Sequence, residues 1–137
     1  MKEVVLDTET TGISVKDGHR LVEIGCIELD NLIPTKNRFH CYLNPERKVS
    51  EKALEVHGYT DEFLATQKKF LEVVEQFLEF IKDKRLIIHN AEFDLSHLNN
   101  ELAILGKKKW ITFIIFFRFN LLASIAWEIS FLFIGNE

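Results

Sequence analysis

Two carboxylates stand two residues apart near the start of the chain, in the segment VVLDTETTG of residues 4–12. Three apolar residues lead into Asp7 and Glu9, as in a short buried strand, and side chains two apart on a strand point to one face. Carboxylates held that close repel each other unless one is protonated or a cation bridges them. Magnesium and manganese prefer such oxygen ligands. Taken alone, the pair favours a solvated strand end, so other residues must decide.

A third carboxylate, Asp94, changes that balance. It falls in the first turn of a predicted helix, on one helical line with three later leucines that should face a sheet. A polar residue on such an apolar stripe needs a partner. If residues 85–89 form a strand parallel to and beside residues 3–7, Asp94 lies above the same carboxyl edge as Asp7 and Glu9. Three acids at one edge predict a metal site, whereas the helix dipole explains only the position of Asp94 along its helix.

Alternating strands and helices are predicted to position these carboxylates. Apolar and β-branched runs closed by turn residues predict strands, and apolar residues three and four apart predict an amphipathic helix. Ser50 and Asn90 are each predicted to cap a helix, and Gly58 and Gly106 to end one. The predicted strands are 3–7, 21–30, 37–45 and 85–90, and the predicted helices are 51–57, 70–81 and 91–106, with a further turn at Thr60.

Composition and charge narrow the possible functions. The 137 residues fit one domain, and 47% hydrophobic with 28% charged residues indicates a globular protein. The net charge of -4 excludes a broad basic surface for duplex nucleic acid, although bound cations can supply local positive charge. Cys26 and Cys41 lack metal or redox spacing, and early acidic residues exclude a secretory signal. A reduced, cytoplasmic location with two free thiols is therefore expected.

The composition changes abruptly after residue 109, so residues 1–109 are interpreted as the domain and 110–137 as an atypical hydrophobic tail. The tail holds both tryptophans and six of the twelve phenylalanines. Three interpretations stay open: a strand and helix buried against the domain, a membrane span, or a stretch produced by a shifted reading frame. A span of roughly 20 apolar residues is long enough for a bilayer, but Arg118, Asn120 and Glu128 would each need a partner there. A membrane location is therefore not expected.

The segments VVLDTETTG and HNAEFD resemble the first two motifs of the DEDD superfamily of 3′→5′ exonucleases. The match extends over residues 1–108 and is nearest to the proofreading epsilon-subunit family of bacterial DNA polymerase III, through LVEIGCIEL, FHCYLNPER, VHGYTDEFL and ELAILGK. The resemblance implies an α/β fold with a ribonuclease H-like mixed five-stranded sheet and flanking helices, incomplete at the C-terminus. It also implies two Mg²⁺ or Mn²⁺ ions, about 4 Å apart, that assist phosphodiester hydrolysis.

The resemblance also implies roles for individual residues and partners. Metal binding and catalysis would fall to Asp7, Glu9 and Asp94, and substrate contacts to Thr10, Thr11, His57 and Phe93. Without the resemblance, His57 is a histidine favoured by a helix end, and Phe93 is nearly as typical of a core. The family often carries an acid where this chain has Lys52, so that substrate contact is not expected. The implied partners are the 3′ end of single-stranded DNA and the catalytic subunit of DNA polymerase III.

The family's third motif, a histidine five residues before a fourth aspartate, is missing from this sequence. The last aspartate is Asp94 and the last histidine is His97. That histidine serves as general base in the family, and the aspartate completes the metal site. The sequence therefore predicts a 3′→5′ DNA exonuclease that is impaired or inactive as written. The alternative is a non-catalytic remnant that binds a metal or a polymerase subunit.

Overall fold

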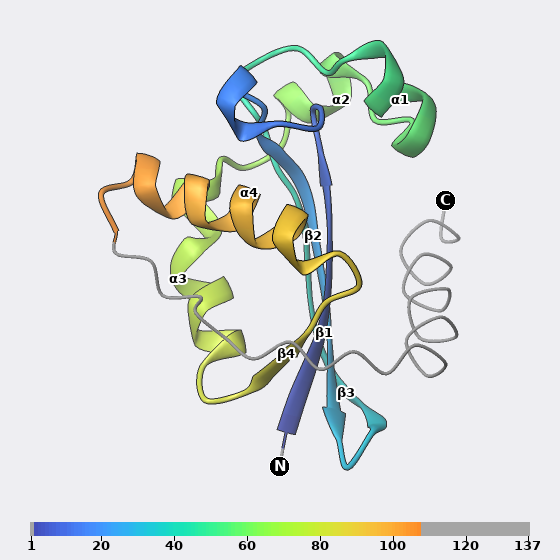
Figure 1. Ribbon diagram of the computed structural model, residues 1–137, viewed down its shortest axis with the longest axis vertical. Coiled ribbons are helices and arrows are strands. Elements are labelled where there is room, and N and C mark those ends of the chain that lie inside the picture. Colours follow the sequence, from blue (N-terminus) through green and yellow to red (C-terminus); the bar gives the residue numbers. More distant parts are fainter. Residues whose placement is uncertain (1, 108–137) are drawn as a thin grey trace.

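A computed structural model describes residues 2–107 of the chain as one sheet with flanking helices (Figure 1). The predictions for residues 110–137 lie outside the described residues. In chain order the elements are β1 (Lys2–Thr10), η1 (Val15–Asp17), β2 (Leu21–Asp30), β3 (Ile33–Tyr42), α1 (Glu51–His57), α2 (Asp61–Ala65), α3 (Phe70–Ile81), β4 (Arg85–Ile87) and α4 (Ala91–Ile104).

The sheet is mixed, and its strand order is β3-β2-β1-β4. β1 pairs with β2 antiparallel and with β4 parallel, while β2 pairs with β3 antiparallel. The parallel pairing of β1 with β4 therefore meets the condition on which Asp94 was expected to approach Asp7 and Glu9. The described residues supply four of the five strands that the family resemblance implies. β4 is shorter than the predicted strand of residues 85–90, because an apolar run has the same pattern inside a strand and just beyond its end.

β2 and β3 form a hairpin that the sequence pattern only partly predicted. β2 has the predicted bounds, but β3 begins at Ile33, four residues before the predicted start. Asn31 and Leu32 join the strands with φ angles of 49° and 67°. Positive φ at both central residues matches the twist of paired strands, so the hairpin closes in two residues. The positive φ of a leucine could not be read from its type.

The ends of α1 and the start of α2 follow local capping chemistry, whereas the start of α4 does not. Ser50 Oγ accepts a hydrogen bond from Ala53 N at 3.2 Å, and Gly58 ends α1 in the left-handed conformation. Thr60 caps α2 in the same way as Ser50 caps α1. Asn90 stands at the N-cap position of α4, but its side chain makes no capping hydrogen bond there. Asn90 is therefore the N-cap residue that the sequence predicted, but it lacks the expected side-chain hydrogen bond, and its φ and ψ of -117° and 72° lie outside the usual capping geometry.

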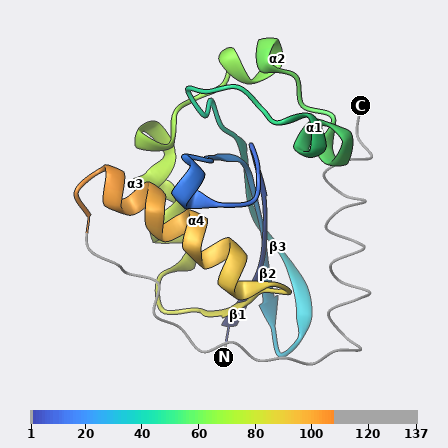
Figure 2. The same ribbon diagram turned by 45° about the horizontal axis from the view of Figure 1, so that its top comes forward.

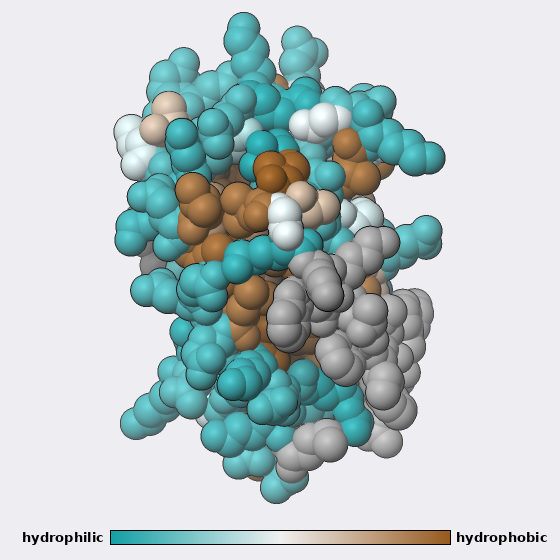
Figure 3. All heavy atoms as spheres, turned by 90° about the vertical axis from the view of Figure 1, so that its left-hand side faces the viewer, coloured by the Kyte–Doolittle hydropathy of each residue, from teal (hydrophilic) through white to brown (hydrophobic). Residues whose placement is uncertain are grey.

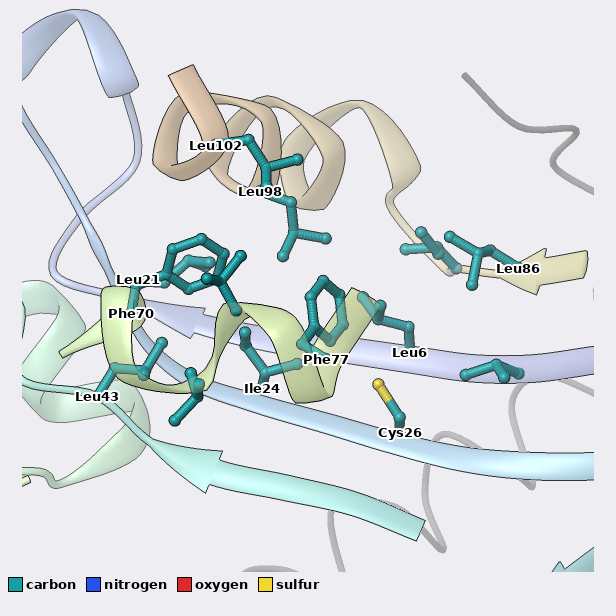
Figure 4. Packing of buried hydrophobic residues seen from close by; sticks show 14 of the residues in the cluster. Leu6, Leu21, Ile24, Cys26, Leu43, Phe70, Phe77, Leu86, Leu98 and Leu102 are labelled. Atoms are coloured by element: carbon teal, nitrogen blue, oxygen red, sulfur yellow. The ribbon is translucent and has the colours of Figure 1, made fainter. Parts of the chain in front are cut away.

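α3 and α4 lie on one face of the sheet, which Figure 1 shows nearly edge-on. Figure 4 shows Phe77 of α3 and Leu98 of α4 pointing toward Leu6 and Ile24 of the central strands. On the other face, a second and smaller apolar cluster consists of Val5, Ile27, Leu29 and Ile87. The apolar residues of the two central strands thus belong to two faces, which fixes the direction of the polar residues between them.

The helical side of the molecule carries an apolar patch between hydrophilic regions, as Figure 3 shows. Among the described residues, Leu71 of α3 and Ile104 of α4 are exposed large hydrophobic residues. Within the described part of the chain, no helix is long and apolar enough to cross a bilayer. Cys26 and Cys41 are both free thiols.

A bulge interrupts the pairing of β1 with β2 near the carboxyl end of β1. Glu9 lies opposite Glu23, but Thr10 lies opposite Leu21, so Val22 is an extra residue on β2. The backbone of β1 beyond this point turns to other partners. Thr10 O accepts from His57 Nε2 at 3.0 Å, and Thr11 O accepts from Ser50 N at 2.9 Å. The bulge therefore directs the end of β1 toward α1, which lies at the same end of the molecule in Figures 1 and 2.

Candidate active site

β1 directs Asp7 and Glu9 to one face of the sheet. Val5 belongs to the smaller apolar cluster, and Val4 belongs to the core beneath the helices. Because side chains alternate along a strand, Asp7 and Glu9 share the face of Val5, while Thr8 shares the face of Val4. The two carboxylates are neighbours in space, as their spacing in the sequence predicted.

Asp94 reaches β1 beside Thr8. It lies in the first turn of α4, is 4% exposed, and accepts a hydrogen bond at 2.5 Å from the Thr8 hydroxyl. β4 pairs with β1 only from Glu3 to Val5, so β4 has ended where Asp94 approaches. Parallel pairing of β4 thus brings the start of α4 to the carboxyl half of β1, as the sequence predicted. Asp94 arrives from the helical side but lies close enough to the other two acids for its charge to raise the pKa of Glu9 and for the charge of Asp7 to raise its own.

The three carboxyl groups share an electrostatic environment that disfavours their charged forms. Burial and repulsion from Asp7, Glu23 and Asp94 raise the pKa of Glu9 to about 7. Burial raises the pKa of Asp94 to about 6, with a further contribution from Asp7, against the opposing hydrogen bond from Thr8. Burial also raises the pKa of Asp7. A bound cation would stabilise the charged forms of carboxyl groups that lie this close together.

The three carboxylates have the right chemistry for a divalent ion, but their positions do not form a complete metal site. Three carboxylates supply the oxygen ligands that Mg²⁺ and Mn²⁺ prefer. However, residues 2–107 contain no group of three or more His, Cys, Asp or Glu side chains placed to hold a metal ion. Asp94 is instead held by Thr8. Ligation of a common ion by Asp7, Glu9 and Asp94 stays a prediction.

Thr10 and Thr11 use their hydroxyl groups inside the protein. Thr10 Oγ1 donates to Gly12 O at 2.6 Å, and Thr11 Oγ1 lies 2.9 Å from His19 Nδ1. Thr11 Oγ1 also accepts from Arg20 N at 3.0 Å. These bonds fold the segment after β1 into a fixed loop. The predicted contact of this segment with a nucleotide stays a prediction that depends on its backbone and surface rather than on free hydroxyl groups.

His57 lies against the end of β1, and Phe93 lies beside Asp94 in the chain. His57 Nε2 donates to Thr10 O, and burial lowers the pKa of the imidazole. Phe93 is half-buried and contacts the His97 ring, with 4.7 Å between the ring centroids. Lys52, the departure from the family pattern, is exposed on α1. The structure therefore brings His57 to the Glu9 end of β1, while its role toward a substrate stays a prediction.

Sequence reasoning missed three residues near these carboxylates. Glu23 lies opposite Glu9 in the sheet and is 7% exposed. Its signal in the sequence was a charged residue inside a mostly apolar strand. His89, two residues after the end of β4, is close enough to oppose the rise in the pKa of Asp7. His97 is fully buried, and its Nε2 donates to Ile13 O at 3.0 Å.

Comparison with known protein families decides the kind of site. A family model described as Exonuclease, RNase_T, matches residues 4–126 of the chain. The chain belongs to the exonuclease family. The resemblance of its two segments to the DEDD exonuclease superfamily is therefore confirmed. In this exonuclease domain, the first-motif acids lie on β1 and the second-motif acid on α4.

Curated relatives of this exonuclease domain carry the name DNA polymerase III subunit epsilon. The protein of that name from Rickettsia conorii is 50% identical over 107 residues, which cover 78% of this chain and 46% of the relative. The Escherichia coli protein is 43% identical over 110 residues, covering 77% of this chain and 45% of the relative. The chain spans about half the length of the curated relatives it matches.

Solved structures confirm the ribonuclease H-like fold of the exonuclease domain. The metal-free form of an E. coli exonuclease I–single-stranded DNA complex superposes with a TM-score of 0.75 at 12% identity, over 91% of this chain and 30% of that one. The nuclease domain of 3′hExo, a DEDDh family member bound to rAMP, gives a TM-score of 0.67 at 17% identity, over 79% and 61% of the two chains. At these identities the likeness shows the fold alone.

Proposed function

We propose that the chain carries the first two motifs of a 3′→5′ DNA exonuclease of the proofreading type. The observation that carries this proposal is the placement of Asp7, Glu9 and Asp94 around the carboxyl half of β1, with mutual repulsion that a cation would relieve. The identity to epsilon subunits supports the choice of DNA and of a polymerase III partner in the cytoplasm.

Asp7, Glu9 and Asp94 would hold Mg²⁺ or Mn²⁺, and the family requires two such ions. Divalent ions at this position supply charge stabilisation at the scissile phosphate and assist attack by water. The chain's own residues would position the DNA end. The loop after β1, with Thr10 and Thr11, would lie under the terminal nucleotide.

His57 and Phe93 would flank the bound nucleotide in this proposal. Phe93 precedes Asp94 in the first turn of α4, and His57 fixes the carbonyl of Thr10. Single-stranded DNA with a free 3′ end is the substrate class that we propose for this acidic site with bound cations. The catalytic subunit of DNA polymerase III would be the protein partner.

The 137-residue chain by itself would cleave DNA slowly or not at all. Its last histidine, His97, is buried and hydrogen-bonded to Ile13 O, so it is not placed to accept a proton from water. Asp94 is the last aspartate, so the chain lacks the fourth acid of the family site. Loss of a general base and of a metal ligand each costs orders of magnitude in rate.

A gel assay on 5′-labelled single-stranded DNA tests the proposal. The chain is incubated with Mg²⁺ or Mn²⁺, beside the Escherichia coli epsilon subunit as positive control. We expect 3′ trimming at least a thousandfold slower than that of the control, in the range set by loss of a base. Residual trimming should vanish in the Asp7→Asn variant. Trimming at the rate of the control would overturn the proposed impairment, and residual trimming that survives Asp7→Asn would overturn the site.

The alternative is a non-catalytic module that binds one cation or the polymerase subunit. The absence of any histidine or aspartate after His97 in this sequence favours it. Calorimetric titration with Mn²⁺ separates the two functions, because a complete site binds two ions and a remnant binds one. Co-purification with the polymerase III catalytic subunit tests the second form of the module. One bound ion, no trimming and stable co-purification would together establish the alternative.

A further inference from the structure

Glu23 is a buried acid whose position calls for a physical reason. It lies directly opposite Glu9 on the neighbouring antiparallel strand and is 7% exposed. Like charges in that relationship destabilise a sheet. Glu23 accepts hydrogen bonds from the Tyr59 hydroxyl at 3.0 and 3.1 Å, and its Oε2 lies 2.7 Å from His40 Nε2. The Glu23 carboxylate therefore holds two side chains from outside β2, Tyr59 and His40, in place.

Tyr59 is in turn tied to His57 in two ways. The Tyr59 backbone N–H donates to His57 Nδ1 at 3.0 Å, and the two rings stack with 4.8 Å between centroids and 18° between planes. His57 Nε2 lies 3.0 Å from Thr10 O, which can only accept. Because Nδ1 accepts and Nε2 donates, these partners fix His57 as the neutral tautomer protonated at Nε2.

These hydrogen bonds and ring contacts link three segments of the chain in a continuous series, here called the circuit. The circuit runs from Glu23 on β2 to Tyr59, then to His57 at the end of α1, and then to Thr10 on β1. Thr10 follows Glu9, which is the residue opposite Glu23. Figures 1 and 2 show α1 and α2 at the end of the molecule where β1 finishes. The circuit therefore links the carboxylate strand to the segment that carries His57.

We propose that Glu23 is a positioning residue that sets the orientation of His57 through the Tyr59 hydroxyl, and so couples the cation-binding end of β1 to contact with the terminal nucleotide. The nucleotide part rests on the function proposed above, whereas the effect on His57 does not. If Glu23 served packing alone, its conservative replacement would alter stability and leave the tautomer of His57 unchanged.

Histidine ring ¹⁵N NMR on the metal-free protein tests the first step. In the parent, His57 should show one tautomer, protonated at Nε2. The Tyr59→Phe variant keeps the stacked ring and loses only the hydroxyl, and Glu23→Gln keeps the volume and loses the charge. Both should shift His57 toward a mixture of tautomers, while Glu55→Gln, an exposed acid on α1, should not. An unchanged His57 signature in folded Tyr59→Phe and Glu23→Gln would overturn the proposal.

Binding measurements test the coupling to the nucleotide. In the presence of Mn²⁺, Tyr59→Phe should weaken binding of a fluorescent five-nucleotide single strand about tenfold, as expected if His57 then keeps its binding orientation only about a tenth of the time. Its Mn²⁺ affinity should stay within about twofold of the parent, because no ligand charge has changed. Equal DNA affinity of the parent and Tyr59→Phe would overturn the coupling. If the parent bound neither Mn²⁺ nor DNA, the proposed function would fail while the NMR result still decided the role of Glu23.

Discussion

Thr8 Oγ1 donates a hydrogen bond to Asp94 Oδ1 across 86 positions of sequence. Both side chains are almost fully buried, at 6% and 4% exposed. Thr8 stands between Asp7 and Glu9 on β1, so this bond fastens the start of α4 to the strand that carries the other two acids. It also opposes the rise in the Asp94 pKa that burial causes. One hydroxyl thus contributes both to the fold and to the ionisation of the site.

Replacing Thr8 by Val should remove this donor while keeping the volume of the side chain. The buried Asp94 carboxylate would lose a charge-assisted hydrogen bond, so we expect a loss of about 2 kcal/mol in the free energy of unfolding at pH 7. The pKa of Asp94 should rise further. Urea denaturation and NMR titration measure the two effects. Thr8→Ser retains the hydroxyl and should recover most of the loss, and equal stability of Thr8→Val and the parent would contradict the role given to the bond.

Glu9→Gln should stabilise the metal-free protein at pH 8. The pKa of Glu9 is raised from 4.5 to about 7, so the folded state binds this proton more tightly than the unfolded state. Stability from that proton is complete below pH 4.5 and is lost as the pH rises through 7. The variant should therefore exceed the parent by on the order of 3 kcal/mol at pH 8 and match it near pH 4.

The comparison with Glu9→Gln at each pH is needed because three histidines act in the opposite direction. Burial lowers the pKa values of His19, His57 and His97, so their contribution grows as the pH rises through 6.5. The difference between variant and parent removes this shared background. Thermal unfolding from pH 4 to 8 measures it, and a difference that does not vary with pH would disprove the raised pKa.

Asp94→Asn should separate stability from metal binding. The neutral amide removes repulsion from the other carboxyl groups and can still accept from Thr8, so the metal-free variant should gain about 1 kcal/mol at pH 8. Its Mn²⁺ affinity should fall roughly tenfold or more, because a charged ligand is gone. Glu92→Gln, an exposed acid in the same helical turn, is the matched control and should change neither quantity. Unchanged Mn²⁺ affinity in Asp94→Asn would remove Asp94 from the site.

Glu28→Gln should destabilise the opposite end of the sheet. Glu28 is 1% exposed and pairs with Lys84 at 2.7 Å, and it accepts hydrogen bonds from Thr35 and Asn37. The hydrogen bond from Lys84 is the main reason that its pKa falls to about 2. The stabilisation is present above pH 4.5 and is lost as the pH falls toward 2. We expect the variant to lose about 3 kcal/mol at pH 7 and much less near pH 2, measured by urea denaturation.

A second ion pair provides the control for Glu28. Glu75 and Lys107 are 2.7 Å apart, but the Glu75 side chain is 78% exposed. Water screens such a pair, so Glu75→Gln should cost less than about 1 kcal/mol at any pH. Equal losses of unfolding free energy in Glu28→Gln and Glu75→Gln would contradict the prediction that burial makes the Glu28 ion pair the stronger one.

Features set by local chemistry were predictable from the sequence. The bounds of β2 and the α1 cap and end at Ser50 and Gly58 agree with prediction, because apolar runs, an N-cap hydroxyl and a left-handed glycine act within a few residues. The approach of Asp94 to Asp7 and Glu9 was predicted on the condition that residues 85–89 pair parallel with the first strand, and β4 meets that condition. Asp7 and Glu9 share a face for the same local reason.

Features set by distant contacts were not predictable. The hydrogen bond between Thr8 and Asp94 depends on how α4 packs against the sheet. The residue spacing within β1 or within α4 does not contain that information. Asn90 has the residue type of a cap, but the chain enters α4 in a geometry that leaves its side chain without that bond. Glu23 was passed over because a strand pattern gives the face of an acid and says nothing about which side chains from a later loop will meet it.

The extra residue Val22 shifts the alternation of side chains along β2. Leu21 packs in the same core as Ile24 and Cys26, although an unbroken strand would put odd and even positions on opposite faces. Deleting Val22 would restore simple alternation with Leu21, Ile24 and Cys26 still on the core face, so the extra residue changes the course of the strand and not its set of core residues. A related strand with one residue fewer at this point should therefore bury the same side chains and lack the bend.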